Sequence, residues 1–241
     1  MKLIELLKLI DDTAKEEGIS QPFICGGLAR DKAVSQIVKL NDIDIMTGYP
    51  DVKLLANKVF IKLKPYNPKY ITAKDGHVSL IINKLKIDFS SNFIIPNLDK
   101  ITGKKLSNIH QEMISRDFTC NTLLMSMDLK TIYDPLKKGI NAIKNKQIDT
   151  CLDPDITFRS RINRVARAIY LSSKLGFELS PRVENWIIKN RELVRLIPQK
   201  YAVEKINKAL YFNYDNTIKL IKKLQLENFL PLNYINFKAA I

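Results

Sequence analysis

Two aspartates, Asp42 and Asp44, stand two residues apart in a segment that alternates between apolar and acidic side chains. Ile43 and Ile45 occupy the other positions, so the alternation over 41–46 predicts a strand with both carboxylates on one face. Two carboxylates this close can share one or two divalent ions, and magnesium is the cation that suits them best. A lone D-x-D pair also occurs on solvated strand edges, and that interpretation stays open.

A second group, GGLARD at 26–31, precedes the acidic pair. Glycine at a turn between a strand and a helix lets backbone N–H groups approach a phosphate, and Arg30 could add bidentate contacts to the same group. Read alone, the Gly-Gly pair is an ordinary turn, and Arg30 with Asp31 is a pair on a helix surface. The order of the block and its spacing to Asp42 and Asp44 favour a phosphate site beside a metal site.

Hydrophobic periodicity predicts the elements that must position these groups. Leu3, Leu6, Leu7 and Ile10 follow the helical spacing of an amphipathic helix that Gly18 stops. Further strands are expected over 23–25, 41–46, 77–82 and 85–90, and further helices over 29–38 and 52–63. After Asp149 the sequence predicts helices separated by prolines, with no clear strand signal.

These elements predict an α/β (α+β) head with a small mixed sheet, followed by an all-α neck and a short helical tail. The change of character near residue 150 predicts two domains. The head is expected over 1–150 and the helical region, which would bind RNA, over 151–241.

At this point the sequence resembles a family, the class II CCA-adding enzymes and bacterial poly(A) polymerases. GGLARD followed by NDIDIMTG at 41–48 is similar to the G-G-x-V-R-D and D-x-D signature of that family, and SRDFTCN at 115–121 is similar to its R-R-D-F-T-x-N block. YDP at 133–135, FRSRINRVARA at 158–168 and LGFE at 175–178 resemble further blocks in the same order. Such an ordered series makes chance similarity improbable.

The resemblance implies roles for individual residues. Asp42 and Asp44 are implied to be catalytic and to hold Mg2+. The implied nucleotide-binding residues, which would contact the phosphates, sugar and base, are Gly26, Gly27, Arg30, Asp31, Arg116, Asp117, Asn121, Arg161, Arg164 and Arg167. The segment from Arg161 to Arg167 is expected to be one helix facing the base. An isolated arginine stripe of this kind is more often a solvated face.

The chain departs from the family pattern at Ser115, Ala142, Ser160 and Arg161. Ser160 and Arg161 replace a Glu-Asp pair that the family is implied to use for reading the base edge. Adenine and cytosine each present a donor beside an acceptor, whereas arginine supplies donors alone. Either Asn163 or a backbone carbonyl provides the missing acceptor, or selectivity for A and C is weakened.

Asp88 lies on the polar face of the strand expected over 85–90. It could be a third catalytic carboxylate facing the metals. A surface salt bridge with Lys86 is an equally good interpretation.

Charge and composition narrow the partners. The 241 residues carry 39 Lys and Arg against 25 Asp and Glu, a net charge of +14, which favours nucleic acid over anionic membrane surfaces. No uninterrupted apolar run is long enough to span a membrane. Three widely spaced cysteines are typical of a reducing compartment, and the charged N-terminus does not resemble a leader peptide. We therefore expect a cytoplasmic protein.

The resemblance implies template-independent transfer of nucleotides to an RNA 3′ end, with Mg2+ as cofactor and ATP and CTP as substrates. CCA addition to the tRNA 3′ end is the first expected activity, and poly(A) synthesis is the second. The alternatives are a catalytically impaired RNA-binding relic of the fold and a nucleotidyltransferase that acts on a protein or small molecule. Family members usually continue into further helices that grip tRNA, so a partner subunit or a homo-oligomer could supply those contacts.

Overall fold

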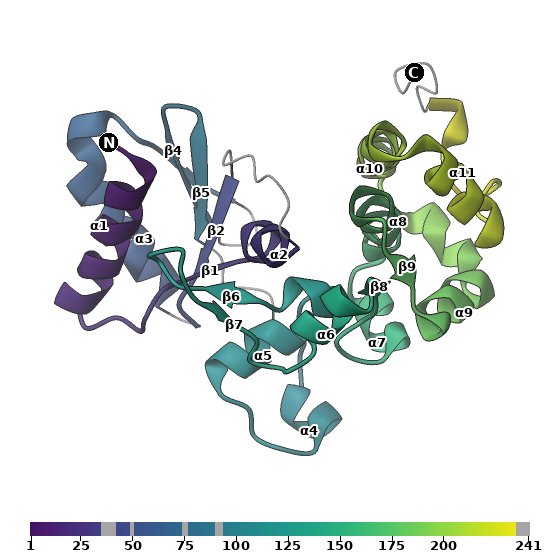
Figure 1. Cartoon of the computed structure of the whole chain (residues 1–241), viewed down its shortest axis with the longest axis horizontal. Coiled ribbons are helices and arrows are strands. Elements are labelled where there is room, and N and C mark those ends of the chain that lie inside the picture. Colours follow the sequence, from purple (N-terminus) through teal and green to yellow (C-terminus); the bar gives the residue numbers. More distant parts are fainter. Residues whose placement is uncertain (35–41, 49–50, 74–76, 90–93, 235–241) are drawn as a thin grey trace. The chain divides into compact units, whose positions relative to one another are not determined.

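The computed structural model describes residues 1–34, 42–48, 51–73, 77–89 and 94–234, and its elements are drawn in Figure 1. The chain divides into two compact units. Unit 1 contains 1–116 and 121–140, and unit 2 contains 117–120 and 141–241. The sequence predicted a boundary near 150, whereas the chain passes from unit 1 to unit 2 after Ile140 and also lends 117–120 to unit 2. No helix in the described ranges is long and apolar enough to cross a membrane.

Unit 1 is built on a seven-stranded mixed sheet in the order β3-β4-β5-β2-β1-β6-β7. Strand β2 runs parallel to β5 and antiparallel to β1. The strands are β1 (Phe23–Cys25), β2 (Asp42–Met46), β3 (Lys69–Thr72), β4 (Val78–Ile82), β5 (Leu85–Phe89), β6 (Leu124–Met125) and β7 (Ile132–Tyr133). The mixed sheet of the predicted head is confirmed, and β3, β6 and β7 are strands that the sequence analysis did not predict.

Alternation along the central strands buries the apolar residues that share a face with Ile43, and a second buried cluster, which contains Cys25 and Met46, lies on the other face. Ile43 and Ile45 on β2 and Ile87 on β5 are fully buried, as their spacing predicted. Strands β4 and β5 are joined at Asn83 and Lys84, which both have positive φ, as a two-residue hairpin turn requires. This tight turn keeps the register that brings β5 beside β2.

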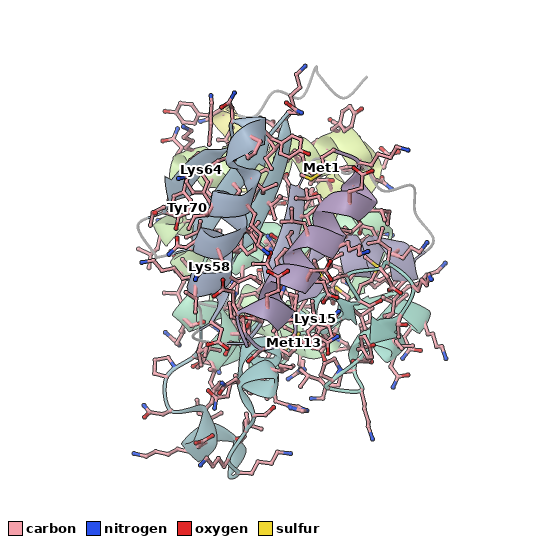
Figure 2. The ribbon with its side chains drawn as sticks, turned by 90° about the vertical axis from the view of Figure 1, so that its left-hand side faces the viewer. Met1, Lys15, Lys58, Lys64, Tyr70 and Met113 are labelled. Atoms are coloured by element: carbon pink, nitrogen blue, oxygen red, sulfur yellow. The ribbon has the colours of Figure 1, made fainter. Side chains whose placement is uncertain are left out.

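Two amphipathic helices, α1 (Leu3–Glu16) and α3 (Val52–Leu63), cover one side of this sheet, and α2 (Gly27–Ala33) lies on the opposite side of the strands in Figure 1. Figure 2 shows α1 and α3 side by side, with Lys15 on α1 and Lys58 on α3. The helix expected over 29–38 begins two residues early, at Gly27. Residues 35–38 of that prediction lie outside the described residues. Unit 1 also contains η1 (Lys64–Tyr66), α4 (Leu98–Thr102) and α5 (Asn108–Ile114).

Unit 2 is mostly helical, as predicted, and its prolines mark where helices begin. Pro154 and Pro181 occupy the first turns of two helices, where the missing N–H costs nothing, and Pro198 caps a third. The helices are α7 (Pro154–Ser160), α8 (Arg164–Leu175), α9 (Pro181–Lys189), α10 (Gln199–Phe212) and α11 (Tyr214–Lys223), with the short turns η3 (Arg191–Leu196) and η4 (Leu232–Tyr234). Two elements, α6 (Gly139–Lys144) and η2 (Thr119–Asn121), join the units.

Two sequence predictions for unit 2 are wrong. No strand was expected after Asp149, but β9 (Glu178–Leu179) lies in that region and pairs in parallel with β8 (Gln147–Ile148), which directly precedes Asp149. The segment 161–167 is not one helix, because α7 ends at Ser160 and Arg161 has an extended backbone. The apolar stripe that suggested a single helix begins only at Val165, and Ile162 is only partly buried.

Candidate nucleotidyl-transfer site

The turn between β1 and α2 explains the first glycine of the GGLARD block. Gly26 has φ +69° and ψ −132°, a conformation that side chains with a Cβ rarely adopt. A Cβ built on Gly26 would also lie 2.6 Å from Oδ2 of Asp44. Glycine therefore lets the Asp44 carboxylate lie directly against the backbone of the turn.

Asp42 and Asp44 share one face of β2, as predicted. Ladder pairing sets their neighbours, because Asp44 is paired with Cys25 on β1 and with Asp88 on β5, while Asp42 is paired with Lys86. Paired residues of adjacent strands point to the same face of a sheet. Asp42 is exposed and Asp44 is half-buried, so both carboxylates are placed to contact a ligand above that face.

The structure shows the ion pair expected of Asp88, whereas its role as a third catalytic carboxylate stays a prediction. Its ladder pairing puts the side chain on the same face as Asp44. Its carboxylate also accepts a short hydrogen bond from the Ser79 hydroxyl and an ion pair from Nζ of Lys86 at 2.5 Å. Asp88 therefore belongs to the acidic face with one oxygen committed to Ser79 and the other to Lys86.

Arg116 extends this group from the end of α5. NH1 of Arg116 lies 3.6 Å from the position of a Cβ on Gly26, and the guanidinium contacts the Cys25 sulfur. The nearly buried Glu112, one turn earlier on α5, holds NH2 of Arg116 at 3.7 Å. Burial opposes the charge of Arg116, but the Cys25 sulfur and the carboxylates of Glu112 and Asp44 outweigh it, so the pKa of the guanidinium is raised.

The Arg30 guanidinium is buried, whereas the sequence suggested a phosphate contact or a pair on the helix surface. Its Nε and NH2 donate to Oδ1 of Asp31 at 2.8 and 2.5 Å, and its NH1 donates to Oδ1 of Asn121 at 2.7 Å. Arg30 therefore ties α2 to the segment at Asn121. A direct contact between Arg30 and phosphate stays a prediction. The backbone of Gly27, at the start of the same helix, has space above it, with NH2 of Arg30 the nearest neighbour of a built Cβ at 3.6 Å.

A second group of candidate residues lies within unit 2. Asp117, which is buried, forms a short ion pair with Nε of Arg167, and its Oδ1 accepts the backbone N–H of Phe118 at 2.9 Å. Arg167 also interacts with Tyr201 on α10. Burial raises the pKa of the Tyr201 phenol, and Arg167 opposes this shift.

Arg164 is the most buried arginine of this group, with 8% of its surface exposed. Its NH1 donates to the backbone carbonyl of Thr157 at 3.2 Å and to Oγ of Ser160 at 3.3 Å. Burial lowers the pKa of Arg164, Asp117 opposes this shift, and the nearby charges of Arg161 and Arg167 add to it. Ser160, one of the departures from the family pattern, thus anchors Arg164.

The sequence analysis missed two residues of these groups, Glu112 and Tyr201. Glu112 and Arg116 stand four residues apart, which is the spacing of an ion pair on a helix. A helix predicted from residue 108 to residue 116 would therefore have indicated this pair. Tyr201 lies far along the chain from Asp117 and Arg167. No local pattern connects Tyr201 to them.

The acidic face of unit 1 fits a magnesium ion by its donor chemistry. Magnesium prefers oxygen ligands and is usually bound through one or two carboxylates together with substrate phosphates and water. Asp42 and Asp44 supply such a pair. A complete protein cage of three or more His, Cys, Asp or Glu ligands is not found in the described part of the chain, and this mode of binding does not require one.

One family model and several CCA-adding enzymes match this chain. The family model described as the poly A polymerase head domain matches residues 22–149. The CCA-adding enzyme of Geobacillus stearothermophilus is 30% identical over 199 residues, which cover 81% of this chain and 46% of that protein. The CCA-adding enzyme of Lactobacillus helveticus is 28% identical over 210 residues, covering 86% and 48%. The chain thus spans about half the length of these relatives.

Solved structures show the same fold. A crystal structure of the Bacillus stearothermophilus CCA-adding enzyme in complex with CTP matches with a TM-score of 0.75 and 25% identity, over 96% of this chain and 55% of that one. A tRNA nucleotidyltransferase complexed with a primer tRNA and an incoming ATP analog matches with a TM-score of 0.71 and 23% identity, over 92% and 62%. The second likeness supports the fold alone.

Proposed function

Because the chain belongs to the poly A polymerase head-domain family, we propose that it transfers a nucleoside monophosphate from an NTP to the 3′ end of an RNA. The observation that carries this proposal is the junction of Gly26, Asp44 and Arg116. There a carboxylate that can hold a cation lies against a glycine turn, and a guanidinium that can meet a triphosphate lies beside it.

Each residue of unit 1 has a definite task in this proposal. Asp42 and Asp44 hold the metal, and Asp88, which is paired with Lys86 on its own strand, ties that strand to β4 through Ser79. Magnesium bound there would favour ionisation of the attacking 3′-hydroxyl and stabilise the charge of the departing pyrophosphate. Arg116 contributes a fixed positive charge that carboxylates and burial keep in one place, so little reorganisation is needed when the triphosphate binds.

For unit 2 we propose that Arg164 and Arg167 contact the nucleotide and that Asp117 positions Arg167. Hydrogen bonds from NH1 of Arg164 to Thr157 and Ser160 fix its guanidinium in one orientation for a ligand. Arg161 adds donors and no acceptor. Selectivity for ATP and CTP is then weaker than an aspartate at this position would give. Incorporation of each of the four nucleotides by the wild type and by Arg161→Asp tests this step, and strict selectivity in the wild type contradicts it.

CCA addition to tRNA is the leading form of the activity, because the relatives described above carry that name. Poly(A) synthesis is the second form, because the matching family model carries that description. The third candidate is an RNA-binding relic of the fold that no longer catalyses transfer. The observation that supports it is the replacement of the family's Glu-Asp pair by Ser160 and Arg161.

One assay separates these candidates. The protein is incubated with magnesium, each labelled NTP separately and mixed, and either a tRNA lacking its CCA end or an unrelated oligo-RNA, with Asp42→Ala/Asp44→Ala as the control. Growth of the tRNA alone by three nucleotides supports CCA addition, and a ladder of A on any RNA supports poly(A) synthesis. Bound RNA without extension in any mixture overturns the catalytic proposal in favour of the relic.

A further inference from the structure

A cavity of about 250 Å3 opens in unit 1 between α5 and the loop that follows β7. Its lining includes His110 and Ile114, which are four residues apart on α5 and therefore share one face of that helix. Glu112 and Arg116 share another face, which lies about 200° around the helix from the first. The cavity is thus separate from the candidate site that contains Arg116.

The lining of this cavity combines an apolar wall with positive charge at its edge. Lys104, Lys137 and Lys138 line it and are exposed, and no acidic residue lines it. None of the ion pairs found among the described residues involves these three lysines. Three uncompensated ammonium groups around one cavity attract a negatively charged ligand. We call this site the lysine pocket.

The apolar part of the lysine pocket is formed by Leu106, Ile114, Pro135 and Leu136. His110 stands beside them, with Nδ1 held by the Ser107 hydroxyl at 2.7 Å, so its other ring nitrogen is the one that can meet a ligand. A ligand that fills such a pocket needs an apolar or ring-shaped part and an anionic part. A nucleotide has both.

Hydrogen bonds hold the loop of the lysine pocket in place. The Asp134 carboxylate accepts three backbone N–H groups, from Lys138 at 3.2 Å, Gly139 at 3.1 Å and Ile140 at 2.9 Å. Lys137 has a positive φ of 55°, so the chain turns sharply at this residue, directly before Lys138. The pocket is therefore formed before any ligand binds, which reduces the entropy lost on binding.

Leu136 anchors the same loop from the inside. It packs against a buried cluster that contains Cys25, Met46 and Met113, next to the first strands of the sheet. Asp134 explains the aspartate of the YDP motif, since it fixes the loop, and Leu136, which directly follows that motif, seats the loop on the core. The loop carries Lys137 and Lys138 at a fixed position relative to α5.

We propose that the lysine pocket binds the RNA strand, with the sugar or base of one nucleotide on the apolar wall and the backbone phosphates on either side of it at the three lysines. Its volume is slightly below the range of about 300 to 1,000 Å3 that encloses whole small-molecule ligands, which favours one residue of a polymer. The net charge of +14 agrees with a polyanionic partner. This inference rests on the proposed function in taking the polyanion to be RNA.

The test compares two triple variants with the same change in charge. Lys104→Ala/Lys137→Ala/Lys138→Ala removes the cations of the lysine pocket. The matched control, Lys8→Ala/Lys53→Ala/Lys64→Ala, removes three exposed lysines of unit 1 from α1, α3 and η1. Lys64 is labelled in Figure 2 on the face formed by α1 and α3. RNA binding is measured by fluorescence anisotropy at a series of salt concentrations.

The expected results follow from counterion release. If all three lysines meet phosphates of a single strand, the slope of log K against log salt falls by about 2, since each contact contributes roughly 0.7. At about 0.1 M salt this corresponds to affinity on the order of 100-fold weaker. The control variant should keep the wild-type slope within about 0.5. Equal losses in the two triple variants, or no loss in either, overturn the proposal.

A second measurement locates the RNA directly. A photo-crosslinking side chain replaces Leu106 in the pocket or, as a control, Leu54, which is exposed on α3. Crosslinking of RNA from position 106 and not from position 54 supports the proposal. RNA that is bound and extended but never crosslinked from position 106 overturns the lysine pocket and leaves the proposed function intact. A wild type that binds no RNA at all overturns both.

Discussion

Arg116 in unit 1 and Arg164 in unit 2 are both largely removed from solvent, yet their surroundings shift their pKa values in opposite directions. Arg116 lies among Cys25, Glu112 and Asp44, and its pKa is raised in spite of burial. Burial lowers the pKa of Arg164, and its neighbours include Asp117 and two further arginines. In unit 2 the Asp117 carboxylate interacts with both Arg164 and Arg167, whereas in unit 1 the carboxylates of Glu112 and Asp44 both act on Arg116.

The difference indicates what each group is prepared to bind. The acidic face of unit 1 has its positive charge already balanced and presents Asp42 in excess, which suits a cation. In unit 2 the buried Arg164 lies near the charges of Arg161 and Arg167, an arrangement that suits an anion.

The largest effect is expected from removing the cation ligands of unit 1. Asp42→Asn/Asp44→Asn should lower the rate of nucleotidyl transfer by on the order of 10^3 or more, because several kcal/mol of charge stabilisation in the transition state depend on the metal. The melting temperature should fall only slightly, because Asp42 is exposed and Glu112 still balances Arg116 when Asp44 is neutralised. Single-turnover kinetics with thermal unfolding as the control decides the matter. Transfer within tenfold of the wild type would falsify the role of the pair.

A smaller effect is expected when the glycine beneath Asp44 is changed. Gly26→Ala places a Cβ 2.6 Å from Oδ2 of Asp44 and adds strain at positive φ, so we expect unfolding free energy to fall by about 1–3 kcal/mol and transfer to fall with it. Gly18→Ala is the matched control, because Gly18 also has positive φ but nothing lies within 4 Å of its Cβ position. Gly18→Ala should lose stability and retain transfer. Full activity in both variants contradicts the proposed role of the turn.

Removing one carboxylate from each unit compares the two arginines directly. Asp117→Asn removes the negative charge that Arg164 and Arg167 share, and we expect a loss of about 1–3 kcal/mol of unfolding free energy. Glu112→Gln should cost less, about 1 kcal/mol, because Asp44 still balances Arg116. Adding NTP should restore more stability to Asp117→Asn than to Glu112→Gln. Equal losses, unchanged by NTP, would show that the two groups do not differ in the way described.

The smallest effect concerns Cys25, which is fully buried and is paired with Asp44 on the adjacent strand. Burial raises the pKa of its thiol to about 12, above the ordinary value of about 8.5. A raised folded-state pKa means that the thiol contributes stability below pH about 8.5 and that this contribution is lost as the pH rises toward 12. Stability of the wild type should therefore fall over this window, and Cys25→Ala should flatten the fall.

Alkylation provides the independent check on Cys25. The native protein should react with iodoacetamide at Cys25 roughly 100-fold or more slowly than the unfolded chain at pH about 8.5, since the thiolate fraction in the folded state is small. Peptide mapping identifies the modified cysteine. Rapid native alkylation at Cys25 would show that the sulfur is neither buried nor protonated as the structure has it.

Local patterns predicted the parts of the molecule that depend on neighbouring residues. The alternation over 41–46 predicted the shared face of Asp42 and Asp44, and the helical spacing near the N-terminus predicted α1. The ordered motifs of the sequence, among them GGLARD and SRDFTCN, predicted the family to which the chain belongs. The same local reasoning failed at 161–167, because a stripe of arginines every three residues continues across a break that only the packing of α7 and α8 imposes.

The tertiary structure alone decided which charged groups meet. The sequence offered Arg30 as a phosphate ligand, but folding places its guanidinium between Asp31 and Asn121. Nothing in the sequence indicated that Tyr201 joins Arg167, or that Lys104 and Lys137 edge one cavity. Amino-acid spacing determines the face of a strand or helix because backbone geometry repeats over a few residues. Contacts between distant segments depend on how those faces pack, and the packing is settled by the whole chain at once.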